Sequence, residues 1–293
     1  GSGVLCTQRD FAKFALVCMR QGRHDGQQLL PAAYLRQATA AQIDNQVAEA
    51  VHEHIQGYGY QFWRISHHGF ACLGMGCQLA ICLPDQDFIL VTTADLQGVP
   101  TGSETIFNAL WQHIFPRLAE SALPPDPTAF EALNRQAQTL RLPVVAGQGT
   151  SPVAAQVNGR RFVMTPGELP IEQVRFDFED DRGMMEYVND TGRHRLGFAF
   201  GRQHRQEFPE THYSGLRIGT PMERGYECYS SAAWTRDDSL VIRVWITDCH
   251  IGNLKINVVF DPPHGTVTLL MAKAAEWFLE GYSGFASGTC EER

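Results

Sequence analysis

The residue types that carry most enzymatic chemistry are present in this sequence, but their spacing does not match the common catalytic motifs. Eleven histidines occur, and His52-Glu53-His54 lacks the four-residue interval that places two zinc ligands on one helix face. Gly281-Tyr282-Ser283-Gly284 comes near the nucleophile elbow Gly-x-Ser-x-Gly, but Phe285 stands at its last position. We therefore expect a solvated helix face in the first case and no independent serine nucleophile in the second.

Paired carboxylates and one histidine pair fall in expected turns. Asp180-Asp181 and Asp237-Asp238 lie where aspartate is favoured because its side chain bonds the local backbone, so turn residues are a better interpretation than a glycosidase pair. His67-His68 occupies a tight hairpin turn. An exposed polar pair is the default there, and a position at the rim of a cleft is the alternative.

Cysteine usage favours a reducing compartment. None of the eight cysteines belongs to a Cys-x-x-Cys pair, and most have apolar neighbours in the sequence. This pattern suits buried thiols better than a disulfide framework or a zinc site, so we expect no metal and no cofactor. The cytoplasm is favoured on this ground, while export of the full-length protein remains open.

Charge and hydropathy exclude two classes of partner. The 32 acidic residues against 24 basic ones give a net charge of -8, and the acidic residues are scattered, so nucleic acid is not expected as a partner. No run of about eighteen apolar residues is long enough to span a bilayer. The chain opens without a methionine or a signal core, and we expect it to be part of a longer protein.

The first half predicts helices followed by an antiparallel meander. Thr7 and Asp10 form a capping-box-like start for an amphipathic helix that ends at Gly22. Pro31 suits the first position of a second helix, and Thr39 is expected to cap a third. The apolar face of the third helix would consist of Ile43, Val47, Val51 and Ile55.

From Gly57 the apolar period changes to two, which predicts strands. The expected strands are 58–63, 70–75, 77–83 and 88–93, with a turn at 66–69. They should form one antiparallel sheet with helices on a face, closed by a helix from about 103 to 118. Pro124-Pro125-Asp126-Pro127 marks a stiff boundary.

The second half predicts a β-rich domain. A capped helix at 128–140 and a Gly/Pro/Ser-rich linker at 143–152 precede it, and a short helix around 274–280 ends it. Turn signals recur at the regular spacing of an antiparallel barrel or sandwich. They are Asn158-Gly159, 180–183, 190–192, 236–238 and His264-Gly265. The expected class is α+β, with domains at 1–123 and 155–293 joined by a helix and linker at 124–154.

Several segments in the first 120 residues match one known family in the right order. They are 4–14, 26–31, Gly57-Tyr58-Gly59-Tyr60-Gln61-Phe62-Trp63 and 70–91. This part resembles the C-terminal half of the catalytic domain in serine hydrolases of the β-lactamase and penicillin-binding protein class, especially the esterase and 6-aminohexanoate-dimer-hydrolase branch. The resemblance implies a partial β-lactamase/transpeptidase-like domain followed by a lipocalin-like β-barrel.

The catalytic serine of that family is absent from this chain. Its nucleophile and base form Ser-x-x-Lys, and this sequence has only three lysines. The residues three positions before Lys13, Lys255 and Lys273 are Asp10, Gly252 and Leu270. The resemblance therefore implies that an upstream segment supplies the nucleophile and that this chain alone is inactive. Tyr187-Val188-Asn189 spells the family's Tyr-x-Asn motif, but it lies in the second domain and we treat it as chance.

The family's third motif aligns with Cys72-Leu73-Gly74, where only the glycine is kept. The missing cation disfavours β-lactams and favours a small ester, amide or peptide substrate. The resemblance assigns an oxyanion-hole donor to the backbone N–H of Met75, beside Gly74, and substrate contacts to Cys72, Leu73, Gly76 and Tyr60. Gly74 and Gly76 would let substrate approach the strand edge, and a bulge in a packed sheet is the alternative.

Two functions remain open at this point. In the first, the N-terminal part is one wall of a serine hydrolase site, completed by another segment of the same protein. In the second, the chain is a non-catalytic module whose β-barrel binds a small ligand or a partner. Alternating apolar residues in the barrel most often form a core.

Overall fold

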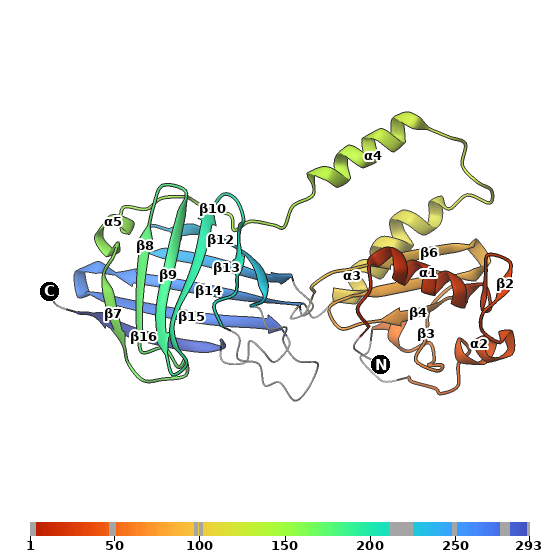
Figure 1. The fold of residues 1–293 in the computed structure, drawn as a ribbon, viewed down its shortest axis with the longest axis horizontal. Helices are drawn as coiled ribbons and strands as arrows, with labels where there is room; N and C mark the ends of the chain where they lie inside the picture. Colours follow the sequence, from red (N-terminus) through yellow and green to blue (C-terminus); the bar gives the residue numbers. More distant parts are fainter. Residues whose placement is uncertain are drawn as a thin grey trace. The chain divides into compact units, whose positions relative to one another are not determined.

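The computed structural model describes residues 4–46, 51–96, 99, 102–210, 225–247, 251–275 and 282–291. The chain divides into two compact units, Gly1–Ala129 and Phe130–Arg293. The first is an α+β unit and the second is a β-barrel, as the sequence predicts (Figure 1).

The first unit begins with α1, whose start agrees with the capping prediction. The helix spans Gln8–Met19, and the Thr7 hydroxyl accepts a hydrogen bond from the Asp10 N–H at 3.2 Å. The helix buries Ala15, Cys18 and Met19. The further elements of this unit are β1 (Arg23–His24), β2 (Gln27–Gln28), α2 (Ala32–Ala38), β3 (Trp63–Arg64), β4 (Phe70–Leu73), β5 (Leu79–Leu83), β6 (Phe88–Thr92) and α3 (Gly102–Ala109).

The predicted meander is present as the antiparallel sheet β3-β4-β5-β6, but its first strand is only Trp63–Arg64, so the predicted strand at 58–63 is wrong for residues 58–62. Helices cover both of its faces, which corrects the expectation of one covered face. Residues of α1 and α2 pack with Phe70, Ala80 and Cys82, whereas Phe107 and Leu110 pack with the opposite face. All five residues of β5 are therefore buried. The closing helix is irregular, because α3 continues as a π-helical turn at Leu110–Ile114 and a 3-10 turn at Phe115–Arg117.

The predicted third helix is wrong. Thr39 ends α2, and its hydroxyl donates to the Leu35 carbonyl oxygen at 2.9 Å instead of capping a new helix. Ile43 is exposed and pairs with Tyr58 in an isolated β-bridge. His52–His54 form only a 3-10 turn, and residues 47–50 lie outside the described part of the chain.

In the sequence, α4 (Pro127–Thr139) follows the strands of the first unit and precedes those of the barrel. The Asp126 carboxylate caps it by accepting from the Ala129 N–H at 2.9 Å. None of its residues is buried.

The second unit is a barrel closed by nine strands. After α5 (Ala154–Val157) come β7 (Arg161–Met164), β8 (Gln173–Phe178), β9 (Arg182–Asn189), β10 (Gly192–Phe200), β11 (His204–Glu207), β12 (Glu227–Arg236), β13 (Ser239–Thr247), β14 (Ile251–Asp261), β15 (Thr266–Ala275) and β16 (Gly284–Cys290). Their order is β10-β9-β8-β7-β16-β15-β14-β13-β12, with β11 added beside β12.

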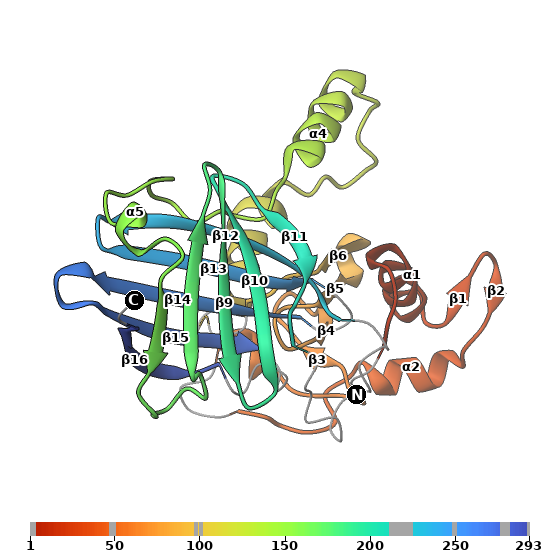
Figure 2. The same ribbon diagram turned by 60° about the vertical axis from the view of Figure 1, so that its left-hand side comes forward.

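The closing contact departs from the predicted all-antiparallel barrel. Ala199 and Phe200 of β10 pair in parallel with Ser231 and Ala232 of β12, while every other pair in this sheet is antiparallel. Strands β8–β10 cross one side of the core and β13–β15 cross the other, as Figures 1 and 2 show. The predicted turns at 190–191 and 237–238 connect β9 to β10 and β12 to β13.

Side chains fill most of the barrel. One end holds an aromatic cluster in which Phe178 lies 5.4 Å from Trp234 and Phe176 lies 5.2 Å from Phe260, measured between ring centroids. The Phe198 ring lies so close to Gly183 that a Cβ there would come within 2.5 Å of it, so glycine is required. Strand residues of β13–β15 that face the core are almost completely buried. The barrel interior is therefore a packed core.

Three further expectations have outcomes in the structure. The predicted helix at 274–280 is wrong where it can be compared, since β15 continues to Ala275, and residues 276–280 lie outside the described part. Seven cysteines are described and all are free thiols. No helix among the described residues is long and apolar enough to cross a bilayer.

Candidate functional site

The end of the barrel opposite the aromatic cluster carries a buried polar network. Along β9 the buried positions alternate as Gly183, Met185, Tyr187 and Asn189, so the strand passes from an apolar interior to a polar end. The β9–β10 register places His194 directly opposite Tyr187, and their ring centroids lie 5.2 Å apart. The hairpin thus brings three polar side chains to one end of the interior.

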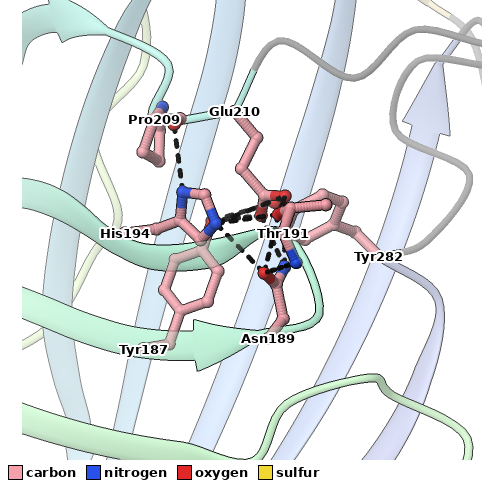
Figure 3. A network of polar contacts seen from close by, with 7 residues as sticks. All are labelled: Tyr187, Asn189, Thr191, His194, Pro209, Glu210 and Tyr282. Atoms are coloured by element: carbon pink, nitrogen blue, oxygen red, sulfur yellow. Dashed lines mark hydrogen bonds and ion pairs between the residues drawn. The ribbon is translucent and has the colours of Figure 1, made fainter.

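Glu210, which follows β11, is the centre of this network (Figure 3). Only 2% of its side chain is exposed. The Tyr187 hydroxyl donates to Oε1 at 2.6 Å, and the Asn189 amide donates to both carboxylate oxygens at 3.2 and 3.1 Å. The Thr191 hydroxyl lies 3.0 Å from Oε2. A buried carboxylate needs such donors, because an unsatisfied one would be strongly destabilising.

The contacts of His194 tie its ring to the network. Nδ1 lies 3.2 Å from the Pro209 carbonyl oxygen. Nε2 lies 3.0 Å from the Asn189 Oδ1 atom and 2.9 Å from the Thr191 hydroxyl. The ring also lies 3.8 Å from Glu210 Oε2.

Tyr187 links this network to a second tyrosine. Its oxygen lies 2.8 Å from the Tyr282 oxygen, and because Tyr187 donates to Glu210, Tyr282 is the donor in this pair. Burial first, and the negative charge of Glu210 second, hold the pKa of Tyr187 well above its usual value. The phenol therefore stays neutral and serves as a hydrogen-bond donor.

A small cavity of about 40 Å³ lies beside the two tyrosines. Its walls combine apolar side chains with polar ones. They are Pro170, Ile171, Tyr187, Asn189, Asp190, Met271 and Tyr282. Asp190 is exposed, so the cavity lies at the outer end of the packed core. Its volume accommodates a group of a few heavy atoms.

The residues assigned from the hydrolase resemblance lie at the tip of the β4–β5 hairpin in the other unit. The Gly74 N–H donates to Gln78 at 2.9 Å, and the Gly74 carbonyl accepts from Cys77 at 3.0 Å. Since a trans peptide directs N–H and C=O to opposite sides, the Met75 N–H points away from the Cys77 N–H. Along β4, β3 pairs with Phe70 and Ala71. The role of Met75 as an oxyanion donor stays a prediction.

Gly74 and Gly76 each have a local reason to be glycine. A Cβ on Gly74 would come within 3.1 Å of the Gln78 carbonyl oxygen. Gly76 has φ +82°, in the left-handed region, and its carbonyl accepts from the Leu96 N–H at 3.2 Å. The geometry of the tight turn therefore accounts for both glycines, whether or not a substrate approaches it.

The other assigned residues are divided between the core and the surface. The Cys72 side chain packs against the core cluster under α1, and burial raises the pKa of its thiol to about 11. Leu73 packs on the opposite face of the sheet, with α3. Tyr60 is exposed, and its ring lies 6.2 Å from that of Tyr34. Any contact of Cys72 with a substrate would therefore involve its backbone.

Two sequence motifs have a structural role that differs from the prediction. Glu53, expected on a solvated face, is buried and accepts from the Ser66 N–H and the Trp111 indole, both at 2.8 Å. His67 and His68 both have φ +56° in their tight turn. The His67 ring packs on aromatic residues, whereas the His68 side chain is 88% exposed. No group of three or more metal-ligating side chains occurs among the described residues.

The polar network is the main feature that sequence reasoning missed. The sequence pattern gives Tyr187 and Asn189 only as a chance motif and assigns no role to Glu210. Their two-residue spacing on a strand does place both side chains on one face. Nothing in the sequence pattern shows, however, that Glu210 and Tyr282 meet them there.

Comparison with known proteins gives a likeness in fold only. The sequence matches no family model, and no curated protein matches it. The barrel is similar to those of small lipid-binding proteins. A fatty-acid-binding protein from Manduca sexta is 8% identical, with a TM-score of 0.29 over 46% of this chain and 99% of that one. A fatty acid-binding protein from Drosophila melanogaster brain is 8% identical, with a TM-score of 0.30 over 46% of this chain and 99% of that one. Lipid binding protein 8 of Caenorhabditis elegans is 8% identical, with a TM-score of 0.31 over 47% of this chain and 96% of that one.

Proposed function

We propose that the C-terminal barrel is a binding module for a small ligand, whose polar group occupies the cavity beside Tyr187 and Tyr282. The proposal rests on one observation. At this cavity the hydroxyl groups of a buried hydrogen-bonded network meet the apolar walls formed by Ile171 and Met271. Binding sites commonly combine apolar walls with a few oriented polar groups in this way.

The composition of the interior supports a specific role for this end of the barrel. Apolar side chains from the aromatic end and from strands β13–β15 already form a hydrophobic core. A buried carboxylate and its donors add no apolar burial and carry a large penalty if one member is lost. Departures of this kind from simple core packing are typical of functional sites.

The size of the cavity limits the ligand. Pockets for drug-sized molecules have about 300–1,000 Å³, whereas this cavity has about 40 Å³. An acyl chain is far larger than this cavity. The bound group therefore has a few heavy atoms, and the remainder of the ligand lies outside the core.

Ligand-observed NMR with a library of small fragments tests this function on the whole chain. Fragments that bind the barrel should lose most of their saturation-transfer signal with Tyr187→Phe, which removes the hydroxyl at the cavity wall and keeps the ring. Tyr229→Phe is the matched control, since Tyr229 lies on the outer face of β12. If no fragment binds, or if both variants bind alike, the proposed site is wrong.

The hydrolase wall is a second candidate function, favoured by the direction of the Met75 N–H. In this proposal the N–H and an N–H of the serine from another segment of the protein would hold the oxyanion of an acyl-transfer reaction. In this proposal the substrate would lie along the part of β4 beyond Ala71, which β3 does not pair.

The gene sequence upstream of Gly1 separates this candidate from a purely binding role. A Ser-x-x-Lys motif about one hundred or more residues upstream would support it, and its absence there would remove it. This chain alone should not hydrolyse p-nitrophenyl esters or nitrocefin, because it contains no Ser-x-x-Lys. Serine-dependent turnover by the purified chain would contradict the assignment.

A further inference from the structure

The charges around the barrel cavity indicate what kind of polar group it accepts. None of the described residues that line it is a lysine, arginine or histidine. The polar residues that line it are Asp190, Asn189, Tyr187 and Tyr282. Hydrogen-bond acceptors therefore predominate at the cavity wall.

The two acidic groups near the cavity differ in how their charge is balanced. Glu210 has the His194 ring 3.8 Å away and accepts from Tyr187 and Asn189, so its charge is already stabilised inside the network. Asp190 forms no ion pair with any residue that the structure describes. Among the described residues that line the cavity, Asp190 is the one with a charged side chain.

We infer that the ligand presents a protonated amine to this cavity, on a short apolar body. An ammonium group offers up to three donors and a positive charge to Asp190 and the tyrosine oxygens. It is also attracted by the faces of aromatic rings such as that of Tyr282. A carboxylate of the same size would bring a second negative charge next to Asp190 and would meet acceptors instead of donors.

This inference rests on the proposed binding function, and it separates the barrel from carriers of anionic lipids. A fatty acid carries a carboxylate, which this lining disfavours, and an acyl chain far larger than the cavity of about 40 Å³. The ligand class expected here is a small alkyl or aryl amine.

Three probes of one size test the inference on the whole chain at constant ionic strength. They are butylammonium, butan-1-ol and butanoate, whose heads are cationic, neutral and anionic. Chemical-shift titration of the methyl groups of Ile171 and Met271 reports binding at the cavity. We expect butylammonium to bind at least tenfold more tightly than butanoate, with butan-1-ol between them.

Two substitutions locate the source of the preference. Asp190→Asn should reduce butylammonium affinity several-fold and leave butan-1-ol affinity almost unchanged, because only the charge is removed. Asp180→Asn is the matched control, since Asp180 is an exposed residue in the β8–β9 turn, away from the cavity lining. It should change neither affinity.

The possible results distinguish the two proposals. If none of the three probes shifts the Ile171 and Met271 signals, the binding function itself is wrong at this site. If butanoate or butan-1-ol binds as tightly as butylammonium, the binding function stands and the amine preference is overturned. An unchanged preference in Asp190→Asn would overturn it equally.

Discussion

Tyr187→Phe tests whether the Tyr187 hydroxyl stabilises the buried Glu210 carboxylate. The substitution keeps the ring, so the packing against His194 remains, and it removes one oxygen that makes two hydrogen bonds. That oxygen donates to Glu210 Oε1 at 2.6 Å and accepts from Tyr282 at 2.8 Å. A hydrogen bond to a charged group contributes roughly 1.5–3 kcal/mol, and loss of a buried partner adds to this.

The expected decrease in the free energy of unfolding of the barrel is therefore about 2–3 kcal/mol. This corresponds to a roughly 30- to 140-fold change in the equilibrium constant. Hydrogen exchange measured by mass spectrometry across a urea series reports it for peptides of β9 and β10, so that the first unit does not contribute. A decrease below about 0.5 kcal/mol, the range of ordinary surface substitutions, would refute the reasoning. So would a decrease no larger than that of Tyr229→Phe.

Three other predictions follow from titration, thiol burial and the β4–β5 hairpin. Because the pKa of Tyr187 is raised in the folded state, its contribution to stability is complete below about pH 10 and is lost as the pH rises further. The free energy of unfolding of the wild type, measured in urea between pH 8 and 11, should therefore decrease in a way that Tyr187→Phe does not show. Burial raises the pKa of Cys18 to about 12 and of Cys72 to about 11, so iodoacetamide at pH 8 should label exposed Cys6 well before either of them. If Cys72 is labelled as fast as Cys6, the Cys72 side chain does not pack under α1. If the full-length protein has the proposed hydrolase activity, Met75→Leu should retain most of it and Met75→Pro should lower kcat on the order of a hundredfold, provided that circular dichroism shows a folded protein. Unchanged kcat in folded Met75→Pro would exclude the oxyanion role.

Local capping and turn chemistry account for the parts of the fold that the sequence predicts well. Thr7 starts α1 through a contact between residues three apart, and the meander follows from alternating apolar residues separated by short turns. These signals depend on neighbours in the chain. The same is true of the barrel turns, whose spacing predicts short antiparallel strands.

The errors arise where distant residues decide the outcome. The apolar spacing of Ile43 and its successors fits a helix, but the Asn45 side chain instead bonds the His54 carbonyl and the Gly57 N–H, residues nine and twelve positions further along. The parallel closure of β10 on β12 joins residues about thirty positions apart in a way that turn spacing cannot reveal. Tertiary contacts override local propensity at such places.

The network illustrates the same limit for function. Tyr187 and Asn189 share one face of β9, which the sequence does predict, but their meaning depends on Glu210, Tyr282 and the register that brings His194 alongside. The sequence treats Tyr187-Val188-Asn189 as a chance match to Tyr-x-Asn, whereas in the structure both side chains donate hydrogen bonds to a buried carboxylate.

The two candidate functions rest on separate units, and this separation decides what each experiment can show. The hydrolase proposal depends on one backbone N–H at the tip of a hairpin and on a serine outside this chain. The binding proposal depends only on residues within the barrel. Substitution of Tyr187 or Asp190 therefore tests the barrel with the β4–β5 hairpin unchanged, and substitution of Met75 tests the hairpin with the network unchanged. If full-length activity depended on Asp190 as well, the barrel site would contribute to substrate selection, and an amine-bearing ester or amide would be the substrate to try first.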